Sequence, residues 1–196
     1  MTRAFLPLRP QRTLWPALAL TALLGGCGGA AEIDNPAGAT GQKLVFAYYQ
    51  RCIEPLLTTP LPAPQGGGSN TCSSGGCHDS STGTGGALRL VGSAALQDLN
   101  QEPATLRASE MYRNFYSAQG VTVPGDALAS RLLTKPLVMG VLHGGGQVLG
   151  STSDLLARRI TYWVNHPAPA EQDEFSTAAA AAMFEGGDVA AGECKL

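Results

Sequence analysis

Several signatures that mark large protein classes are missing from this sequence. Its 196 residues include only three histidines, and 14% of the side chains are charged. No basic patch is interleaved with aromatic residues, which argues against nucleic-acid binding. There is no Gly-x-Ser-x-Gly elbow and no Walker loop, so no hydrolase or transferase site is indicated. After residue 26 no apolar run is long enough to span a bilayer, and alternating strand patterns are almost absent. The sequence therefore predicts one mostly α-helical domain with long loops.

Short helices are expected where apolar residues recur every three or four positions or where a capping residue precedes a good helix former. The expected segments are 41–56, 94–99, 104–118, 127–134, 152–165 and the alanine run that begins at Ser176. Pro55 and Pro167 are expected to end the first helix and the helix at 152–165. In the latter, Leu155 and Trp163 belong to the apolar stripe, and Trp163 is expected to anchor the core.

Residues 1–26 have the features of an export signal. Arg3, Arg9 and Arg12 give a basic start, and a short apolar stretch follows them. The run LLGGC at 23–27 resembles a bacterial lipobox, in which a cut site precedes a cysteine. This resemblance implies cleavage before Cys27 and acylation of its thiol. The alternative is an ordinary secretory signal followed by a chance cysteine.

A lipid on Cys27 would place the rest of the chain in the cell envelope. Residues 27–39 are small and polar and would form a flexible tether. We therefore expect a lipid-anchored protein on the periplasmic side of a membrane. Gly28 stands where inner-membrane lipoproteins carry aspartate, which favours the outer membrane.

Four cysteines remain for the folded domain if Cys27 carries lipid: Cys52, Cys72, Cys77 and Cys194. Free thiols are unusual in an oxidising compartment. In one scheme Cys72 and Cys77 are used together and Cys52 pairs with Cys194, which would dock the C-terminal segment at 169–196. In the other, the four cysteines form two disulfides of different pairing.

The stretch TCSSGGCH at 71–78 brings two cysteines and a histidine close together. The tighter pattern Cys-x-x-Cys-His attaches c-type haem, with thioether bonds from the cysteines and an axial bond from the histidine. Here four small residues separate Cys72 from Cys77, and they can loop out because glycine tolerates unusual backbone angles. The pattern predicts covalent haem on Cys72 and Cys77 with His78 as the proximal iron ligand. The alternatives are a small disulfide loop and a zinc site that includes another histidine.

Other segments, read in order with this loop, resemble the planctomycete-type monohaem cytochrome c domain. They are FAYYQRCIEPLL at 46–57, GGALRL at 85–90, PGDALASRLLTKPL at 124–137 and ARRITYWVNHP at 157–167. The resemblance implies a small cytochrome c-like helical domain at 40–168, with long loops around one haem c. It also implies electron transfer with redox proteins of the envelope.

The sequence departs from that family at two points. The family has two residues between its haem cysteines, and a Met-Pro-Pro segment whose methionine is the expected second axial ligand. KPLVMGVLHGGGQVL at 135–149 stands in place of that segment. His143, in a glycine-rich loop, is our candidate for the distal ligand, and Met139 is the alternative. Neither residue need fill the position.

Two functions follow from these observations. The first is a monohaem c-type cytochrome that carries electrons and is not an enzyme, unless the sixth iron position is open. Arg89, Arg131 and Lys135 are candidates to neutralise the haem propionates. The second is a non-redox, disulfide-stapled surface lipoprotein that binds a partner or a carbohydrate.

Overall fold

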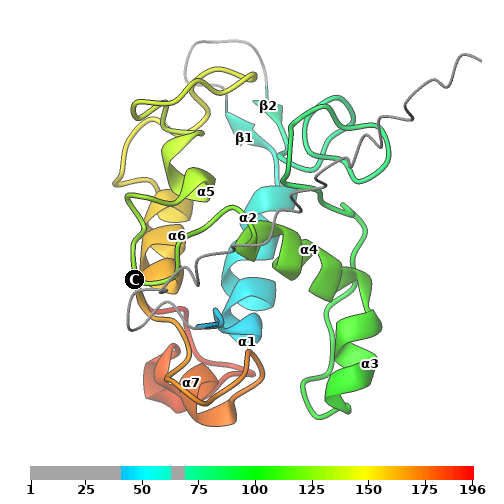
Figure 1. The fold of residues 1–196 in the computed structure, drawn as a ribbon, viewed down its shortest axis with the longest axis vertical. Coiled ribbons are helices and arrows are strands. Elements are labelled where there is room, and N and C mark those ends of the chain that lie inside the picture. The colour runs from blue at the N-terminus through cyan, green and yellow to red at the C-terminus, as the bar shows by residue number, and fades with distance from the viewer. Residues whose placement is uncertain (1–40, 63–68) are drawn as a thin grey trace, which may run out of the picture. The chain divides into compact units, whose positions relative to one another are not determined.

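The structure is a computed structural model that describes residues 41–62 and 69–196. Its regular secondary structure is almost entirely helical, which confirms the prediction of a mostly α fold (Figure 1). The elements are α1 (Phe46–Tyr48), the π-helical turn η1 (Tyr49–Ile53), α2 (Glu54–Thr58), β1 (Leu61–Pro62), β2 (Ser69–Asn70), α3 (Pro103–Ala108), α4 (Glu110–Gln119), α5 (Arg131–Thr134), α6 (Leu155–Asn165), α7 (Thr177–Ala182) and the 3₁₀ turn η2 (Glu185–Gly187). The two short strands pair antiparallel. None of the helices in the described ranges is long and apolar enough to cross a membrane.

The first helix is continuous through α1, η1 and α2, and it runs from Phe46 to Thr58 rather than over 41–56. Pro55 does not end it, because the chain widens to a π-helical turn just before the proline. In that turn the Glu54 N–H donates to the carbonyl of Tyr49, five residues earlier. Pro55 then lies in the first turn of α2, where its missing N–H costs little. In the same π-helical turn, the carbonyl of Cys52 accepts a hydrogen bond from the guanidinium of Arg159 at 3.2 Å.

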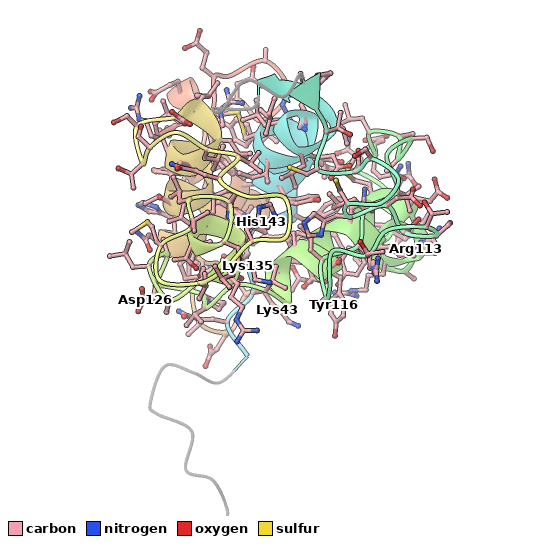
Figure 2. The ribbon with its side chains drawn as sticks, turned by 90° about the horizontal axis from the view of Figure 1, so that it is seen from above. Lys43, Arg113, Tyr116, Asp126, Lys135 and His143 are labelled. Carbon is pink, nitrogen blue, oxygen red and sulfur yellow. A yellow bond between two sulfur atoms is a disulfide. The ribbon has the colours of Figure 1, made fainter. Side chains whose placement is uncertain are left out.

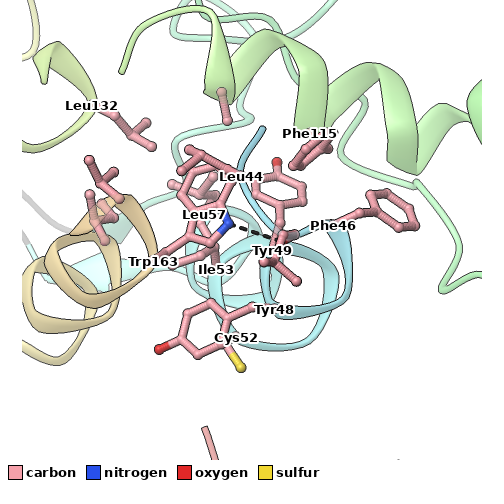
Figure 3. Packing of buried hydrophobic residues seen from close by; sticks show 14 of the residues in the cluster. Leu44, Phe46, Tyr48, Tyr49, Cys52, Ile53, Leu57, Phe115, Leu132 and Trp163 are labelled. Atoms are coloured by element: carbon pink, nitrogen blue, oxygen red, sulfur yellow. Dashed lines mark hydrogen bonds between the residues drawn. The ribbon is translucent and has the colours of Figure 1, made fainter. Parts of the chain in front are cut away.

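Aromatic side chains of this first helix form the centre of the core (Figure 3). The rings of Phe46 and Phe115 meet edge to face with centroids 5.4 Å apart, and Tyr49 and Trp163 are also 5.4 Å apart. Trp163 is fully buried and donates its indole N–H to the carbonyl of Val45 at 3.0 Å. The first helix therefore packs between α4 and α6, and Trp163 anchors the core as predicted.

The helix expected at 104–118 is broken into α3 and α4 at Ser109. The backbone of Ser109 is extended, and its hydroxyl accepts the N–H of Tyr112, which caps α4. Ser109 favours this role because its side chain competes with helical hydrogen bonds. Leu106, Met111 and Phe115 are buried, so the predicted inward face was correct.

Two expected helices are shorter or missing. Residues 94–99 form no helix, because the buried side chain of Gln50 holds both the N–H and the carbonyl of Gln97. The segment at 127–134 is helical only over α5, and Asp126 caps a turn through the N–H of Ala129 instead. Leu155 opens α6 but is 46% exposed, so its place in the buried stripe was predicted wrongly.

The C-terminal segment packs against the first helix. The hydroxyl of Ser176 accepts the N–H of Ala179 and caps α7, which confirms the helix expected there. Phe184 is fully buried, and its ring lies 5.8 Å from that of Tyr48. The Tyr48 hydroxyl donates to the carbonyl of Lys195 at 2.6 Å. The described residues belong to one compact unit, so 169–196 is part of the same domain.

Candidate functional site

Cys72, Cys77 and His78 lie in an irregular loop that follows β2. The N–H of Cys77 donates to the carbonyl of Ser74, and the N–H of His78 donates to the carbonyl of Cys72, both at 3.0 Å. These bonds close residues 73–76 into a turn, with Gly76 at a φ of 84°. The four residues between the cysteines therefore loop out, and Cys72 lies beside Cys77 and His78.

Both cysteines are half-buried, and Cys72 is a thiol rather than one half of a disulfide. Burial, together with the neighbouring Cys77, raises the pKa of the Cys72 thiol to about 11. This thiol is therefore neutral at physiological pH. The structure joins Cys52 to Cys194, with Cα atoms 6.0 Å apart, which is the pairing that the first cysteine scheme requires.

The imidazole of His78 is held by the backbone of residues 88–90. Its Nδ1 lies 3.1 Å from the carbonyl oxygen of Leu88, and the N–H of Leu90 donates to the carbonyl of His78 at 2.7 Å. An Nδ1–H that donates to a carbonyl leaves the lone pair on Nε2, the arrangement found in metal-ligating histidines. Burial is the largest cause that lowers the pKa of His78, and the positive charges of Arg89 and Lys135 lower it too. The neutral, ligating form is therefore favoured.

His143 has the same arrangement in a different loop. Its Nδ1 lies 2.7 Å from the carbonyl oxygen of Gly146, whose N–H donates back to the carbonyl of His143 at 2.9 Å. Gly146 has a φ of 72°, a conformation that glycine adopts without strain. This closed turn fixes the side chain of His143 and also leaves Nε2 as its ligating atom.

The two histidines are brought together although they are far apart in the sequence. Their ring centroids are 6.1 Å apart and the ring planes differ by 10°. With metal–nitrogen bonds of about 2 Å and an imidazole radius added on each side, two axial imidazoles have ring centres about 6 Å apart. The two rings therefore lie at about the separation of two axial imidazoles.

Met139, the alternative distal residue, is 42% exposed in the same segment. Val138 and Leu142 are also exposed, at 37% and 87%, so this segment presents several apolar side chains to the surface. Val138 has a φ of 54°, which is unfavourable for a β-branched residue. The ring of His143 lies near that of His78, and Met139 stays the alternative distal ligand.

The basic residues near the histidines have different roles. The guanidinium of Arg89 donates to the carbonyl of Gly83, so it ties the cysteine–histidine loop together. Arg131 is exposed on α5. Lys135 lies on the same face as His143 (Figure 2) and close enough to His78 to lower its pKa. Lys135 is therefore the best placed of the three to meet a carboxylate beside the histidine pair.

A buried carboxyl in the first helix was not anticipated from the sequence. Glu54 is 4% exposed; its Oε2 accepts from the Tyr49 hydroxyl at 2.5 Å and its Oε1 from the Asn114 amide at 2.7 Å. Asn114 also bonds both backbone groups of Val91, next to the stretch that holds His78. The sequence feature that could have indicated this buried carboxyl is a glutamate among apolar residues of the helix at 46–58. Through Asn114, this hydrogen-bond network connects the first helix to the backbone beside the loop that carries His78.

The zinc alternative finds no support in the geometry. Within 41–62 and 69–196, no group of three or more His, Cys, Asp or Glu side chains is placed to hold a metal ion. A surface hollow of about 550 Å³ lies over α4, and neither histidine lines it. The signal segment, the tether and Cys27 lie outside the described residues.

Comparison with known proteins adds no relative to these observations. No protein-family model, no curated protein and no solved structure matches this chain.

Proposed function

We propose that this protein is a monohaem c-type cytochrome that transfers electrons in the bacterial cell envelope. The observation that carries the proposal is the pairing of His78 with His143, at a separation suited to two axial ligands. Independent support comes from the position of Cys72 and Cys77, which immediately precede one of these histidines.

Each of the four residues has a distinct role in this proposal. The thiols of Cys72 and Cys77 would hold the porphyrin by thioether bonds, each formed by adding S–H across a vinyl group. His78 and His143 would hold the iron through their Nε2 atoms. When bound, the haem supplies one-electron chemistry.

Two filled axial positions favour electron transfer over catalysis. A substrate or gas would have to displace His143, whose ring is fixed by the turn that ends at Gly146. The protein would thus act with redox partners in the envelope rather than as an enzyme. Its proposed membrane attachment is a lipid on Cys27, and the Cys52–Cys194 disulfide suits an oxidising compartment.

The test is the spectrum of the full chain, co-expressed with the haem-attachment machinery. We expect a c-type haemochrome in alkaline pyridine, which is lost when Cys72 and Cys77 are both replaced by alanine. His143→Ala should convert the six-coordinate spectrum to a five-coordinate one. Met139→Leu, a matched change in the same loop, should leave it unaltered.

The opposite results would be equally informative. A colourless, folded protein would overturn the cytochrome proposal and leave the disulfide-stapled lipoprotein. A loss of six-coordination in Met139→Leu, but not in His143→Ala, would assign the distal position to Met139.

A further inference from the structure

Several glycines lie in the loop that carries His78, and Gly83 and Gly85 differ in what surrounds them. A Cβ atom built on Gly85 would lie 2.5 Å from Nδ1 and 2.6 Å from Cε1 of His78, and 2.7 Å from the carbonyl oxygen of Cys77. These distances are far below van der Waals contact. Position 85 therefore has no room for a side chain while the imidazole occupies its place.

The requirement for glycine at position 85 is steric rather than conformational. The backbone φ of Gly85 is outside the positive region, in contrast to Gly86 at 78°. The backbone of Gly85 is also fixed, because its N–H donates to the carbonyl of Cys77 at 2.7 Å. A larger residue would not meet the penalty of a positive φ here, but its Cβ would overlap the histidine ring.

We propose that Gly85 is a positioning residue for His78: the missing side chain lets the Nδ1–Cε1 edge of the imidazole lie against the backbone. In that position Nδ1 reaches the carbonyl of Leu88, Nε2 is the nitrogen left to ligate, and the ring plane lies parallel to that of His143. The significance for iron ligation rests on the proposed function. The steric relationship itself does not need haem.

Gly83 provides a matched control within the same loop. A Cβ on Gly83 would lie 2.5 Å from the carbonyl oxygen of Asp79 and 2.6 Å from that of Cys77, so its nearest clashes are with backbone atoms rather than with the His78 ring. Gly144, beside His143, is a neutral control, since a Cβ there has nothing within 4 Å and its φ is not positive. Comparing alanine substitutions at these three glycines separates an effect on the His78 ring from general damage to the loop.

The first experiment is a double-mutant cycle on the full chain produced without haem. We expect Gly85→Ala to lower the urea midpoint of unfolding, and to lower it by at most about half as much when His78→Ala is also present. Gly83→Ala should cause the same loss in both backgrounds, and Gly144→Ala should cause almost none. If Gly85→Ala prevents folding, recovery of a folded chain in the His78→Ala background is the expected result.

Two outcomes of this cycle would overturn the proposal. One is an equal loss for Gly85→Ala with and without the His78 ring. The other is a chain that Gly85→Ala unfolds in both backgrounds. Either would mean that the glycine serves the loop backbone alone.

The second experiment reads the ring directly by nitrogen-15 NMR of the apoprotein. The wild-type His78 ring should show a single Nδ1–H tautomer, and Gly85→Ala should lose it, whereas Gly83→Ala keeps it. Identical His78 shifts in the wild type and Gly85→Ala would contradict the proposal.

With haem attached, the angle between the two imidazole planes gives a further measurement. Parallel planes split the iron d orbitals and give a rhombic ferric low-spin EPR signal, whereas crossed planes do not. The wild type and Gly144→Ala should be rhombic, and Gly85→Ala should change the spread of g values; an unchanged signal would count against the positioning role. A wild-type chain that never acquires haem would refute the proposed function but not the steric inference, which the apoprotein tests.

Discussion

The disulfide between Cys52 and Cys194 joins the buried first helix to a residue two positions from the last, across a sequence separation of 142 residues. Cys52 is fully buried, and its carbonyl also accepts the guanidinium of Arg159. The bond therefore links the centre of the core to the C-terminal segment.

Loss of this disulfide should be costly. Closing a loop of this length removes entropy from the unfolded chain worth up to about 5 kcal/mol in the chain-entropy model. We expect Cys194→Ser to lower the free energy of unfolding by a large part of that amount, measured by urea denaturation. Reductant should lower the stability of the wild type but not of the variant. Equal stability of the oxidised wild type and Cys194→Ser would contradict this.

The buried carboxyl of Glu54 should make stability depend on pH. Burial raises its pKa above the ordinary 4.5, although the hydrogen bonds from Tyr49 and Asn114 oppose the rise. Because the unfolded carboxyl ionises at lower pH than the folded one, the contribution of Glu54 is fully present below about pH 4.5 and is lost as the pH rises through the folded pKa.

Glu54→Gln tests this dependence, because glutamine has the same shape and can still bond Tyr49 and Asn114. Relative to this variant, the wild type should lose stability as the pH rises above about 4.5. Urea midpoints across that range provide the measurement. A constant difference between the two proteins would show that Glu54 titrates at the same pH folded and unfolded.

Trp163 should tolerate substitution poorly. Trp163→Phe removes buried volume and leaves the carbonyl of Val45 without its indole donor, so a loss of about 2–4 kcal/mol is expected. Leu155→Ala on the same helix removes a side chain that is 46% exposed and should cost clearly less. Thermal or urea unfolding of both variants checks the order. Similar losses would mean that α6 buries a different face.

Val138 should be replaceable with a gain in stability. It ends the turn after α5 at a φ of 54°, and the N–H of Met139 donates to the carbonyl of Thr134, as in a helix C-cap that normally uses glycine or asparagine. Val138→Asn should raise the free energy of unfolding by about 1 kcal/mol. Leu142→Asn, at a position 87% exposed, is the matched control and should change it little. A destabilised Val138→Asn would show that contacts of the valine outweigh its backbone strain.

Local sequence patterns were sufficient for the helical class and for the inward faces of the later helices. Met111 and Phe115 in α4, and Ile160 and Trp163 in α6, repeat at helical spacing and are buried. They could be predicted because periodicity acts within one element. The places where expected helices break or are missing were harder to predict. Ser109 competes with the backbone hydrogen bonds of its own helix, and residues 94–99 are held by the side chain of Gln50 from the first helix.

The candidate site, too, could be predicted only in part from the sequence. The sequence by itself determined that two cysteines and His78 stand together, because a short loop keeps neighbours close. It left the partner of His78 open between His143 and Met139, and it left the cysteine pairing open as well. The tertiary structure decided the Cys52–Cys194 pairing, since docking the C-terminal segment against the first helix brings the two residues together. It also places the ring of His143 6.1 Å from that of His78, while the distal ligand stays a prediction. Such long-range pairings depend on the whole core and leave no periodic signal in the chain.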